Sequence, residues 1–215
     1  MTTFLFPSDY FRPNLVDEMY QTEATAFQAA GFQVAVISLE SLSTDSPRIR
    51  PLLTPNANVI YRGWMLCTSD YQKLVTAVFQ AGACIQTSRV DYLATHYLPN
   101  WYHSIKDLTP ETYFYDTDGD LENELTKLGW DRFFVKDYVK SLKTSMGSII
   151  THPSEIKLVI AEMHKFRGTI EGGICIRRVE DFIPTSEQRY FVINGKVFAA
   201  DPTGIIPAIA TLLCC

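Results

Sequence analysis

The sequence lacks most of the features that identify a class of protein at once. Its five cysteines are odd in number and form no C-x-x-C pair, which argues against a disulfide framework and favours a reducing cytoplasm. No apolar run approaches the length of a membrane span, and the N-terminus has no basic region of the kind that opens a signal peptide. We therefore expect a cytoplasmic protein with no membrane partner.

Positive charge and metal-binding patterns are also scarce. The net charge is −5, so no strong basic field favours nucleic acid as a partner. The four histidines form no close pair of the kind seen in zinc sites. Residues 116–122 look like a calcium loop but fail its spacing, because Leu121 takes the place of the required glycine. We expect no metal ligands here, and a turn whose aspartates cap the next helix.

The common nucleotide and nucleophile motifs are missing as well. The sequence contains no G-x-S-x-G and no G-x-G-x-x-G after a strand. It contains no Walker loop either, since Gly195-Lys196 lacks the upstream glycine and the following hydroxyl residue. Covalent nucleophilic catalysis has no support, and a nucleotide would have to be held in another way.

What the sequence does contain is a regular succession of apolar strands and amphipathic helices. In the first half they alternate, which predicts a mostly parallel α/β sheet, and the second half is typical of an α+β arrangement. The predicted strands are Thr3–Pro7, Phe32–Ser38, Asn58–Met65, Ala83–Thr87, Thr112–Asp116, Phe133–Val139, Gly173–Phe182, Glu187–Ile193 and Lys196–Ala200. The predicted helices are Leu15–Ala30, Ser69–Gln80, Leu121–Leu128 and Pro153–Phe166, with a loop at Ser43–Asn58 and a hairpin turn at Asn194-Gly195.

The most informative stretch is residues 132–143, an apolar strand with a lysine in its middle that runs into a basic, hydroxyl-rich loop. The strand period of two places Phe134, Lys136, Tyr138 and Lys140 on one face. Lysines beside aromatic rings suit an anionic, partly flat ligand such as a nucleotide. The simpler alternative is a solvated strand face of an antiparallel sheet, which composition alone favours.

Two later segments add what a nucleotide needs. Adenine requires an apolar slot, ribose a carboxylate acceptor, and phosphates a lysine or arginine. Arg177–Phe182 ends a predicted strand with basic, apolar and acidic residues, and Glu187–Arg189 opens the next one. Together with Lys136 these segments could supply all three requirements.

The order of these segments resembles the ATP-grasp superfamily, and in particular a bacterial and phage clade named for two arginines and a lysine. The resemblance runs from Phe4 to about Asp201. It is carried by Tyr61-Arg62-Gly63-Trp64-Met65, Leu98-Pro99-Asn100-Trp101-Tyr102, Val135–Ser141, Gly172-Gly173 with Arg177, and Glu187-Gln188-Arg189-Tyr190-Phe191. It implies an N-terminal α/β domain (1–107), a small ATP-grasp subdomain (108–183) and a partial large subdomain with an incomplete sheet (184–215).

The resemblance also implies an ATP site. In it, Lys136 matches the strand lysine that contacts phosphate and the adenine edge, and residues 140–148 match the mobile loop that covers phosphates. The implied nucleotide contacts are Lys136, Lys140, Ser141, Lys143, Arg177, Val179, Glu180, Phe182 and Glu187, with Val179 and Phe182 flanking adenine, Glu180 at the hinge and Glu187 holding ribose. Arg62 and Arg189 are the implied catalytic residues, facing phosphates or the acyl substrate.

The implied reaction is carboxylate activation, in which ATP makes an acyl phosphate and an amine then displaces phosphate. The implied partners are ATP and a carboxylate or amine, either a small molecule or a peptide. Lysine, arginine and Mg²⁺ clamp the charge in such chemistry. No acidic pair follows Asp201 to hold Mg²⁺, so we expect a C-terminally truncated or frameshifted member. The alternatives are a non-catalytic nucleotide-binding or interaction module on the same fold, and a structural α/β domain.

Overall fold

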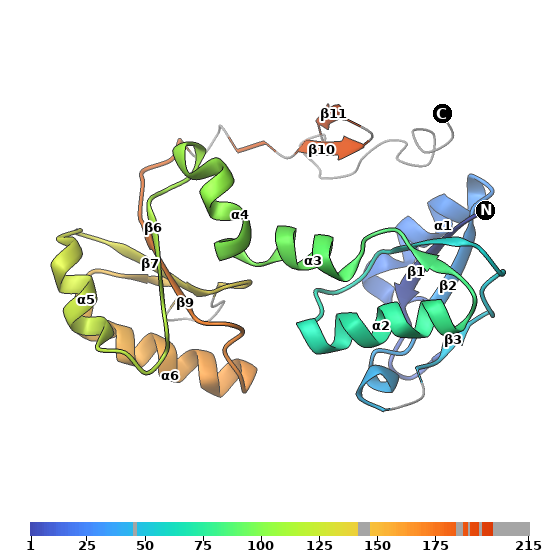
Figure 1. Cartoon of the computed structure of the whole chain (residues 1–215), viewed down its shortest axis with the longest axis horizontal. Coiled ribbons are helices and arrows are strands. Elements are labelled where there is room, and N and C mark those ends of the chain that lie inside the picture. Colours follow the sequence, from blue (N-terminus) through green and yellow to red (C-terminus); the bar gives the residue numbers. More distant parts are fainter. Residues whose placement is uncertain (45–46, 142–146, 184–186, 189, 194, 200–215) are drawn as a thin grey trace. The chain divides into compact units, whose positions relative to one another are not determined.

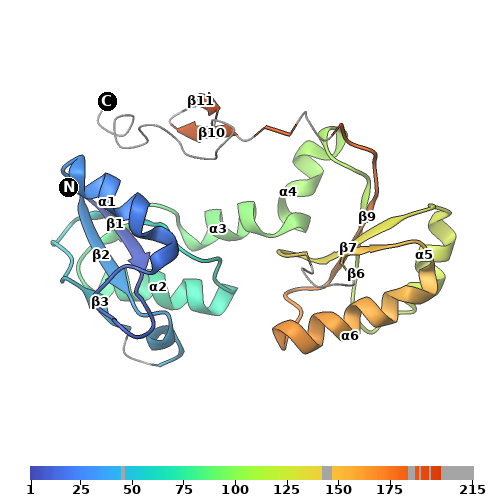
Figure 2. The same cartoon turned by 180° about the vertical axis from the view of Figure 1, so that it is seen from behind.

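The computed structural model describes residues 1–44, 47–141, 147–183, 187–188, 190–193 and 195–199. These form two compact units (Figures 1 and 2). Unit 1 comprises Met1–Arg89 and the described residues after Phe182, and unit 2 comprises Val90–Phe182. In the described part of the chain, no helix is long and apolar enough to cross a membrane. The three-part division at residues 107 and 183 stays a prediction.

Unit 1 is built on a five-stranded sheet with the order β3-β2-β1-β4-β5. The parallel strands are β1 (Thr2–Pro7), β2 (Gln33–Ile37), β4 (Asn58–Tyr61) and β5 (Cys84–Ile85), and β3 (Ile49–Arg50) runs antiparallel to β2 at the edge. The predicted mostly parallel α/β sheet is therefore confirmed. The loop prediction for Ser43–Asn58 missed β3.

Two helices cover opposite faces of this sheet, α1 (Gln21–Ala29) and α2 (Thr68–Gln80) (Figures 1 and 2). The rings of Phe4 in β1 and Phe27 in α1 stack with centroids 3.6 Å apart. On α2, Leu74 and Val78 are fully buried. Because helices cover both faces, β1 is buried almost along its whole length, which explains its continuous apolar sequence.

Two boundaries in unit 1 were wrong. The helix predicted from Leu15 begins only at Gln21, after a 3₁₀ turn, η1 (Glu18–Tyr20), whose start is capped by the Asp17 carboxylate accepting the Met19 N–H at 2.9 Å. A second 3₁₀ turn, η2 (Glu40–Ser43), follows β2. The strand predicted to reach Met65 ends at Tyr61, the last residue of β4 that pairs with β1, opposite Leu5.

Unit 2 contains a four-stranded antiparallel sheet with the order β6-β9-β7-β8. Its strands are β6 (Thr112–Tyr115), β9 (Ile174–Arg178), β7 (Phe133–Asp137) and β8 (Ile149–Ile150). Two helices, α5 (Leu121–Leu128) and α6 (Ile156–Arg167), pack on one face, where Phe133, Val135, Ile174 and Ile176 are buried. The Asp120 carboxylate accepts the Asn123 N–H at the start of α5, as predicted.

Among the described residues, the opposite face of this sheet is covered in part, by α4 (Leu98–Ile105). Leu98 and Tyr102 of α4 pack against Cys175, with Phe114 and Tyr138 beside them. The helix α3 (Arg89–His96) precedes α4, and neither helix was predicted. Two 3₁₀ turns complete the unit, η3 (Lys106–Leu108) before β6 and η4 (Pro153–Glu155) before α6.

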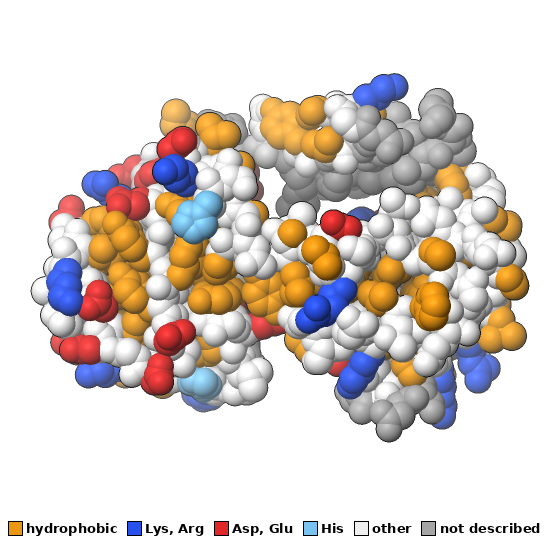
Figure 3. All heavy atoms as spheres, viewed as in Figure 1, with side chains coloured by type: hydrophobic (Ala, Val, Ile, Leu, Met, Phe, Trp, Pro, Cys, Tyr) orange, Lys and Arg blue, Asp and Glu red, His pale blue; other side chains and the backbone are white. Residues whose placement is uncertain are grey.

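The described residues after Phe182 form a hairpin of β10 (Tyr190–Ile193) and β11 (Lys196–Ala199), in which Ile193 pairs with Lys196. The predicted hairpin is thus confirmed. On the face of the molecule in Figure 3, acidic and basic side chains are interspersed around hydrophobic ones.

Candidate functional site

The candidate site begins on the open face of the unit 2 sheet. Along β7, Phe133, Val135 and Asp137 are buried while Phe134 and Lys136 are half-buried, so the predicted alternation is confirmed over these five residues. Phe134 pairs with Arg177 of β9, and Lys136 pairs with Cys175. Paired residues share a face in a sheet, so one surface presents a ring and two cations.

A pocket of about 480 Å³ lies at one end of this face, and we call it the β9 pocket. Its apolar lining comes from Pro110, Phe134, Ile149, Val179 and Phe182, and its polar lining from Arg177, Arg178 and Glu180. Phe134 and Ile149 stand side by side because β7 and β8 pair at these residues. The pocket therefore offers a flat apolar slot with charged groups at its border, which suits a heteroaromatic ring joined to anionic groups.

Arg177 is the most constrained cation of the β9 pocket. Its Nη2 donates a hydrogen bond to Thr109 Oγ1 at 2.5 Å, which fixes the guanidinium beside β6. Burial lowers the pKa of Arg177, although an arginine stays protonated at neutral pH. A partly desolvated cation interacts more strongly with an incoming anion than one in water does.

The segment after β9 is held by an ion pair. Arg132 Nη2 lies 2.6 Å from Asp181 Oδ1, and the Arg132 carbonyl accepts the Val179 N–H at 3.4 Å. These contacts fasten the residues between Val179 and Phe182 beside the start of β7. The predicted strand to Phe182 was wrong, because β9 ends at Arg178. Glu180 and Phe182 are exposed, and Phe182 keeps 70% of its surface accessible.

Lys136 is positioned by a tight turn at the end of β7. Its Nζ donates to the Val139 carbonyl at 3.1 Å. The Asp137 carboxylate, 2% exposed, accepts the backbone N–H groups of Val139 and Lys140, and the Asp137 N–H donates to the Lys140 carbonyl. The strand was predicted to continue to Val139, but this turn reverses the chain so that Ser141 bridges back to Lys136. Lys140 is therefore exposed in a turn and not on the strand face.

A pair of glycines packs beneath Tyr138, which follows this turn. A Cβ on Gly172 would lie 2.1 Å from the Tyr138 ring, and Gly172 has φ +84°. A Cβ on Gly173 would lie 2.6 Å from the Tyr115 carbonyl. The Tyr138 carbonyl in turn accepts the first N–H of α4, from Leu98, at 2.9 Å. The glycines thus let β7, β9 and α4 close together around one ring.

The remaining predicted site residues lie elsewhere. Arg62 follows β4 in unit 1, where its Nε lies 2.6 Å from Glu23 Oε1. Glu187 is exposed and lies in unit 1. Lys143 and Arg189 lie outside the described residues. The structure thus groups Arg177, Val179, Glu180 and Phe182 in the β9 pocket, with Lys136 on the same sheet face.

Sequence reasoning missed several parts of this site. Pro110 and Ile149 line the β9 pocket, Thr109 orients Arg177, and Asp137 builds the turn behind Lys136. The sequence could have indicated Asp137, because it falls on the predicted buried face of the strand, where a carboxylate needs hydrogen-bond partners. The other three depend on strand register, for which the sequence offers no signal.

The described residues contain no group of three or more histidine, cysteine, aspartate or glutamate side chains that could hold a metal ion. The region after Asp201, where the resemblance implies the acidic ligands, lies outside the described residues. We therefore assign no protein ligand to Mg²⁺.

Similarity to known proteins is found among solved structures, and it concerns the fold. No protein-family model matches the sequence, and no curated protein sequence matches it. Among solved structures, a RimK domain protein ATP-grasp from Sphaerobacter thermophilus DSM 20745 is similar with a TM-score of 0.55 and 12% identity, over 89% of this chain and 69% of that one. The ATP-grasp ligase PsnB complexed with minimal precursor has a TM-score of 0.52 and 11% identity, over 92% and 69%.

A third similar structure is a D-cycloserine synthetase, with a TM-score of 0.51 and 10% identity, over 82% of this chain and 59% of that one. At these identities the likeness concerns the fold alone. The chain has the fold of ATP-grasp ligases, as predicted, and it spans about 59–69% of the length of these three structures.

Proposed function

We propose that this protein binds ATP in the β9 pocket and acts in the manner of an ATP-dependent carboxylate–amine ligase. The observation that carries the proposal is the β9 pocket itself, an apolar slot beside Arg177 on the open face of a sheet with an ATP-grasp fold. Adenine would lie between Phe134 and Ile149 on one side and Val179 and Phe182 on the other. Glu180 is exposed, and its backbone would meet the adenine edge.

The cationic side chains would bind the phosphates. Arg177 borders the β9 pocket, and Lys136 lies farther along the same face of the sheet. Lys140, Ser141 and Lys143 follow in sequence and would cover the phosphates, while Glu187 would hold ribose. Arg62 and Arg189 would face the phosphates or the acyl substrate. Fixed cations of this kind stabilise the charge that develops during phosphoryl transfer.

In the proposed reaction, a carboxylate oxygen attacks the γ-phosphorus of ATP, ADP leaves, and an acyl phosphate forms. An amine then attacks the acyl carbon and phosphate leaves, so that an amide results. Mg²⁺ bound to ATP would neutralise part of the phosphate charge in this class of chemistry. The second substrate would be a small molecule or a peptide bearing a carboxylate or an amine.

The first experiment measures ATP binding to the full chain by calorimetry, with Mg²⁺ present. We expect binding, and we expect Arg177→Gln and Lys136→Ala each to weaken it about tenfold or more, because each removes a charge-assisted contact to phosphate. Lys165→Ala is the matched control, since Lys165 lies exposed on α6, at the opposite face of the sheet. Absence of ATP binding, or equal affinity in all four proteins, would refute the proposal.

Turnover separates the ligase from the non-catalytic module on the same fold. Release of ADP and phosphate in the presence of carboxylates and amines, lost in Lys136→Ala, supports the ligase. ATP binding without release of either product under any acceptor supports the binding module.

A further inference from the structure

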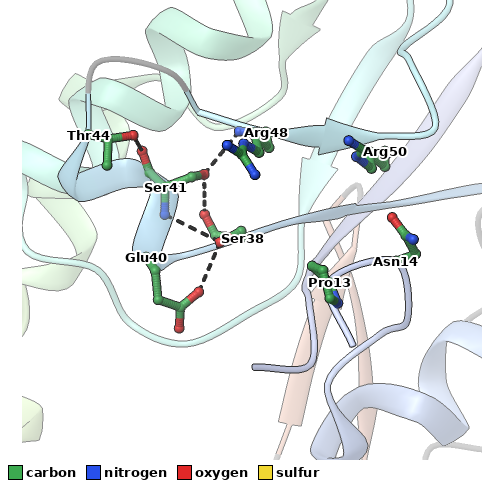
Figure 4. Close-up of a pocket in the computed structure, with 8 residues that line it drawn as sticks. All are labelled: Pro13, Asn14, Ser38, Glu40, Ser41, Thr44, Arg48 and Arg50. Carbon is green, nitrogen blue, oxygen red and sulfur yellow. Dashed lines mark hydrogen bonds between the residues drawn. The ribbon is translucent and has the colours of Figure 1, made fainter. Parts of the chain in front are cut away.

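A second pocket, in unit 1, has an arginine pair that the proposed function does not use. We call it the Arg48 pocket (Figure 4). It encloses about 340 Å³ at the carboxyl end of β1 and β2, the edge at which open α/β sheets bind ligands. The lining comes from three segments. The loop after β1 contributes Pro13 and Asn14, the turn after β2 contributes Ser38, Glu40, Ser41 and Thr44, and the β3 edge contributes Arg48 and Arg50.

The two arginines are placed alike. Arg48 precedes β3 and Arg50 ends it, so they are two residues apart along an extended chain and point to the same side, with their Cα atoms about 7 Å apart. Within the described part of the chain, neither guanidinium lies within 4 Å of a carboxylate. Both are exposed at the mouth of the pocket, so each retains its fork of N–H donors for a ligand.

The floor of the Arg48 pocket is fixed before any ligand arrives. Ser41, 7% exposed, donates from Oγ to the Ser38 carbonyl at 2.6 Å and accepts the Arg48 N–H at 2.9 Å. The Ser38 hydroxyl accepts the Ser41 N–H at 3.3 Å and donates to Glu40 Oε2 at 2.9 Å. Figure 4 shows these bonds joining the turn after β2 to the edge strand. Binding would therefore not need these groups to rearrange, which limits its entropic cost.

The charges set the ligand class. The two arginines start one strand repeat apart on the backbone, so one molecule with two separated anionic groups can meet each guanidinium with one of them. Planar guanidiniums bind carboxylates through two parallel hydrogen bonds. The Glu40 carboxylate at the rim leaves a net charge of only +1 among the lining residues, which disfavours polyanions. The volume suits a small molecule.

We propose that Arg48 and Arg50 bind the two carboxylates of a small dicarboxylate ligand in unit 1. All residues of this site lie in unit 1 and those of the β9 pocket lie in unit 2, so the two sites share no residue.

The test is calorimetry on the full chain without ATP, using glutarate, the neutral analogue glutaramide and inorganic phosphate at equal ionic strength. We expect glutarate to bind and glutaramide not to bind. Arg48→Gln and Arg50→Gln should each weaken glutarate binding about tenfold, the loss of one charge-assisted bidentate contact. Glu40→Gln should tighten it, because a like charge at the rim is removed.

Arg89→Gln is the matched control, since Arg89 is exposed in unit 1 and does not line the pocket. It should bind glutarate like the unchanged protein. Three results would overturn the proposal. They are equal binding of glutaramide, an equal loss in Arg89→Gln, and phosphate binding that exceeds glutarate binding with the same dependence on Arg48 and Arg50. Thermal unfolding of each variant shows whether it is folded, and a loss of glutarate affinity is considered only in a folded variant.

Discussion

The turn behind Lys136 predicts a specific loss of stability in unit 2. The Asp137 carboxylate is 2% exposed and accepts the N–H groups of Val139 and Lys140. Asp137→Ala removes both hydrogen bonds at once, because the same oxygen, Asp137 Oδ1, accepts them. An unsatisfied buried donor costs about 1–3 kcal/mol. Both hydrogen bonds are only partly buried, so water can replace the lost acceptor in part, and we expect a total loss of about 2 kcal/mol in the free energy of unfolding.

Asp137→Asn separates hydrogen bonding from charge. The amide oxygen still accepts both N–H groups, so this variant should lose about 1 kcal/mol, the part due to a charge-assisted bond. The same order of effects should appear in ATP binding, because the turn holds the carbonyl to which Lys136 Nζ donates. A control is Asp118→Ala, which changes an exposed aspartate in the same unit.

The assay is urea unfolding followed by tryptophan fluorescence. A protein of two compact units need not unfold in one step, so the signal should come from unit 2 alone. A Trp64→Phe background achieves this, since the other two tryptophans, Trp101 and Trp130, both lie in unit 2. If Asp137→Ala unfolds within 0.5 kcal/mol (about the scatter of neutral surface changes) of its parent, the turn does not hold the end of β7 as argued.

Three other predictions concern the same unit. Burial raises the pKa of Cys175 to about 12. A thiol reagent at pH 8 should therefore modify the exposed Cys67 and Cys84 in the native protein, and Cys175 only after unfolding. Early labelling of Cys175 would contradict its burial. Burial lowers the pKa of His96 from its usual 6.5, so the unfolded chain takes up the proton first as the pH falls. The stability of the protein should therefore fall as the pH drops through 6.5, and it should fall less in His96→Gln. Thermal unfolding at pH 5.5 and 7.5 measures both. Tyr102→Phe should cost about 1–3 kcal/mol in urea, because the Tyr102 hydroxyl accepts a buried N–H of β6 at 2.9 Å; a change near zero would mean that the N–H finds another partner.

How far the fold could be predicted depended on burial. Strand β1 and helix α5 matched their predicted bounds to within one residue, because each has an apolar pattern or a cap that matches its packing. Helix α3 was missed because its eight residues contain only one turn of apolar spacing, at Val90, Leu93 and Ala94, and none of its residues is buried. In α4 only Leu98 and Tyr102 are buried, so its apolar pattern is weak. Pro99 lies in its first turn, and although proline is tolerated there, it argues against a helix when the sequence alone is considered.

The candidate site shows the same limit at the level of side chains. The pattern along β7 predicted that Phe134 and Lys136 share a face, because that depends only on the strand period. It did not predict that Ile149 would lie beside Phe134, which requires the register of β8 against β7. The turn at Asp137 was missed for a related reason. Its bonds run to N–H groups two and three residues later, and a strand continuing to Val139 satisfies the apolar pattern equally well.

Register also changes which residue is the leading candidate for the proposed nucleotide binding. The sequence made Lys136 the leading candidate, yet its Nζ is engaged with the Val139 carbonyl at 3.1 Å. Arg177 instead lines the β9 pocket directly, opposite Phe134 on the neighbouring strand. Phe134 and Lys136 are about 7 Å apart along the strand, so the face runs from an apolar slot flanked by Arg177 to a second cation farther along. A ligand that is flat at one end and anionic along its length fits that order, and the two cations would meet different parts of it.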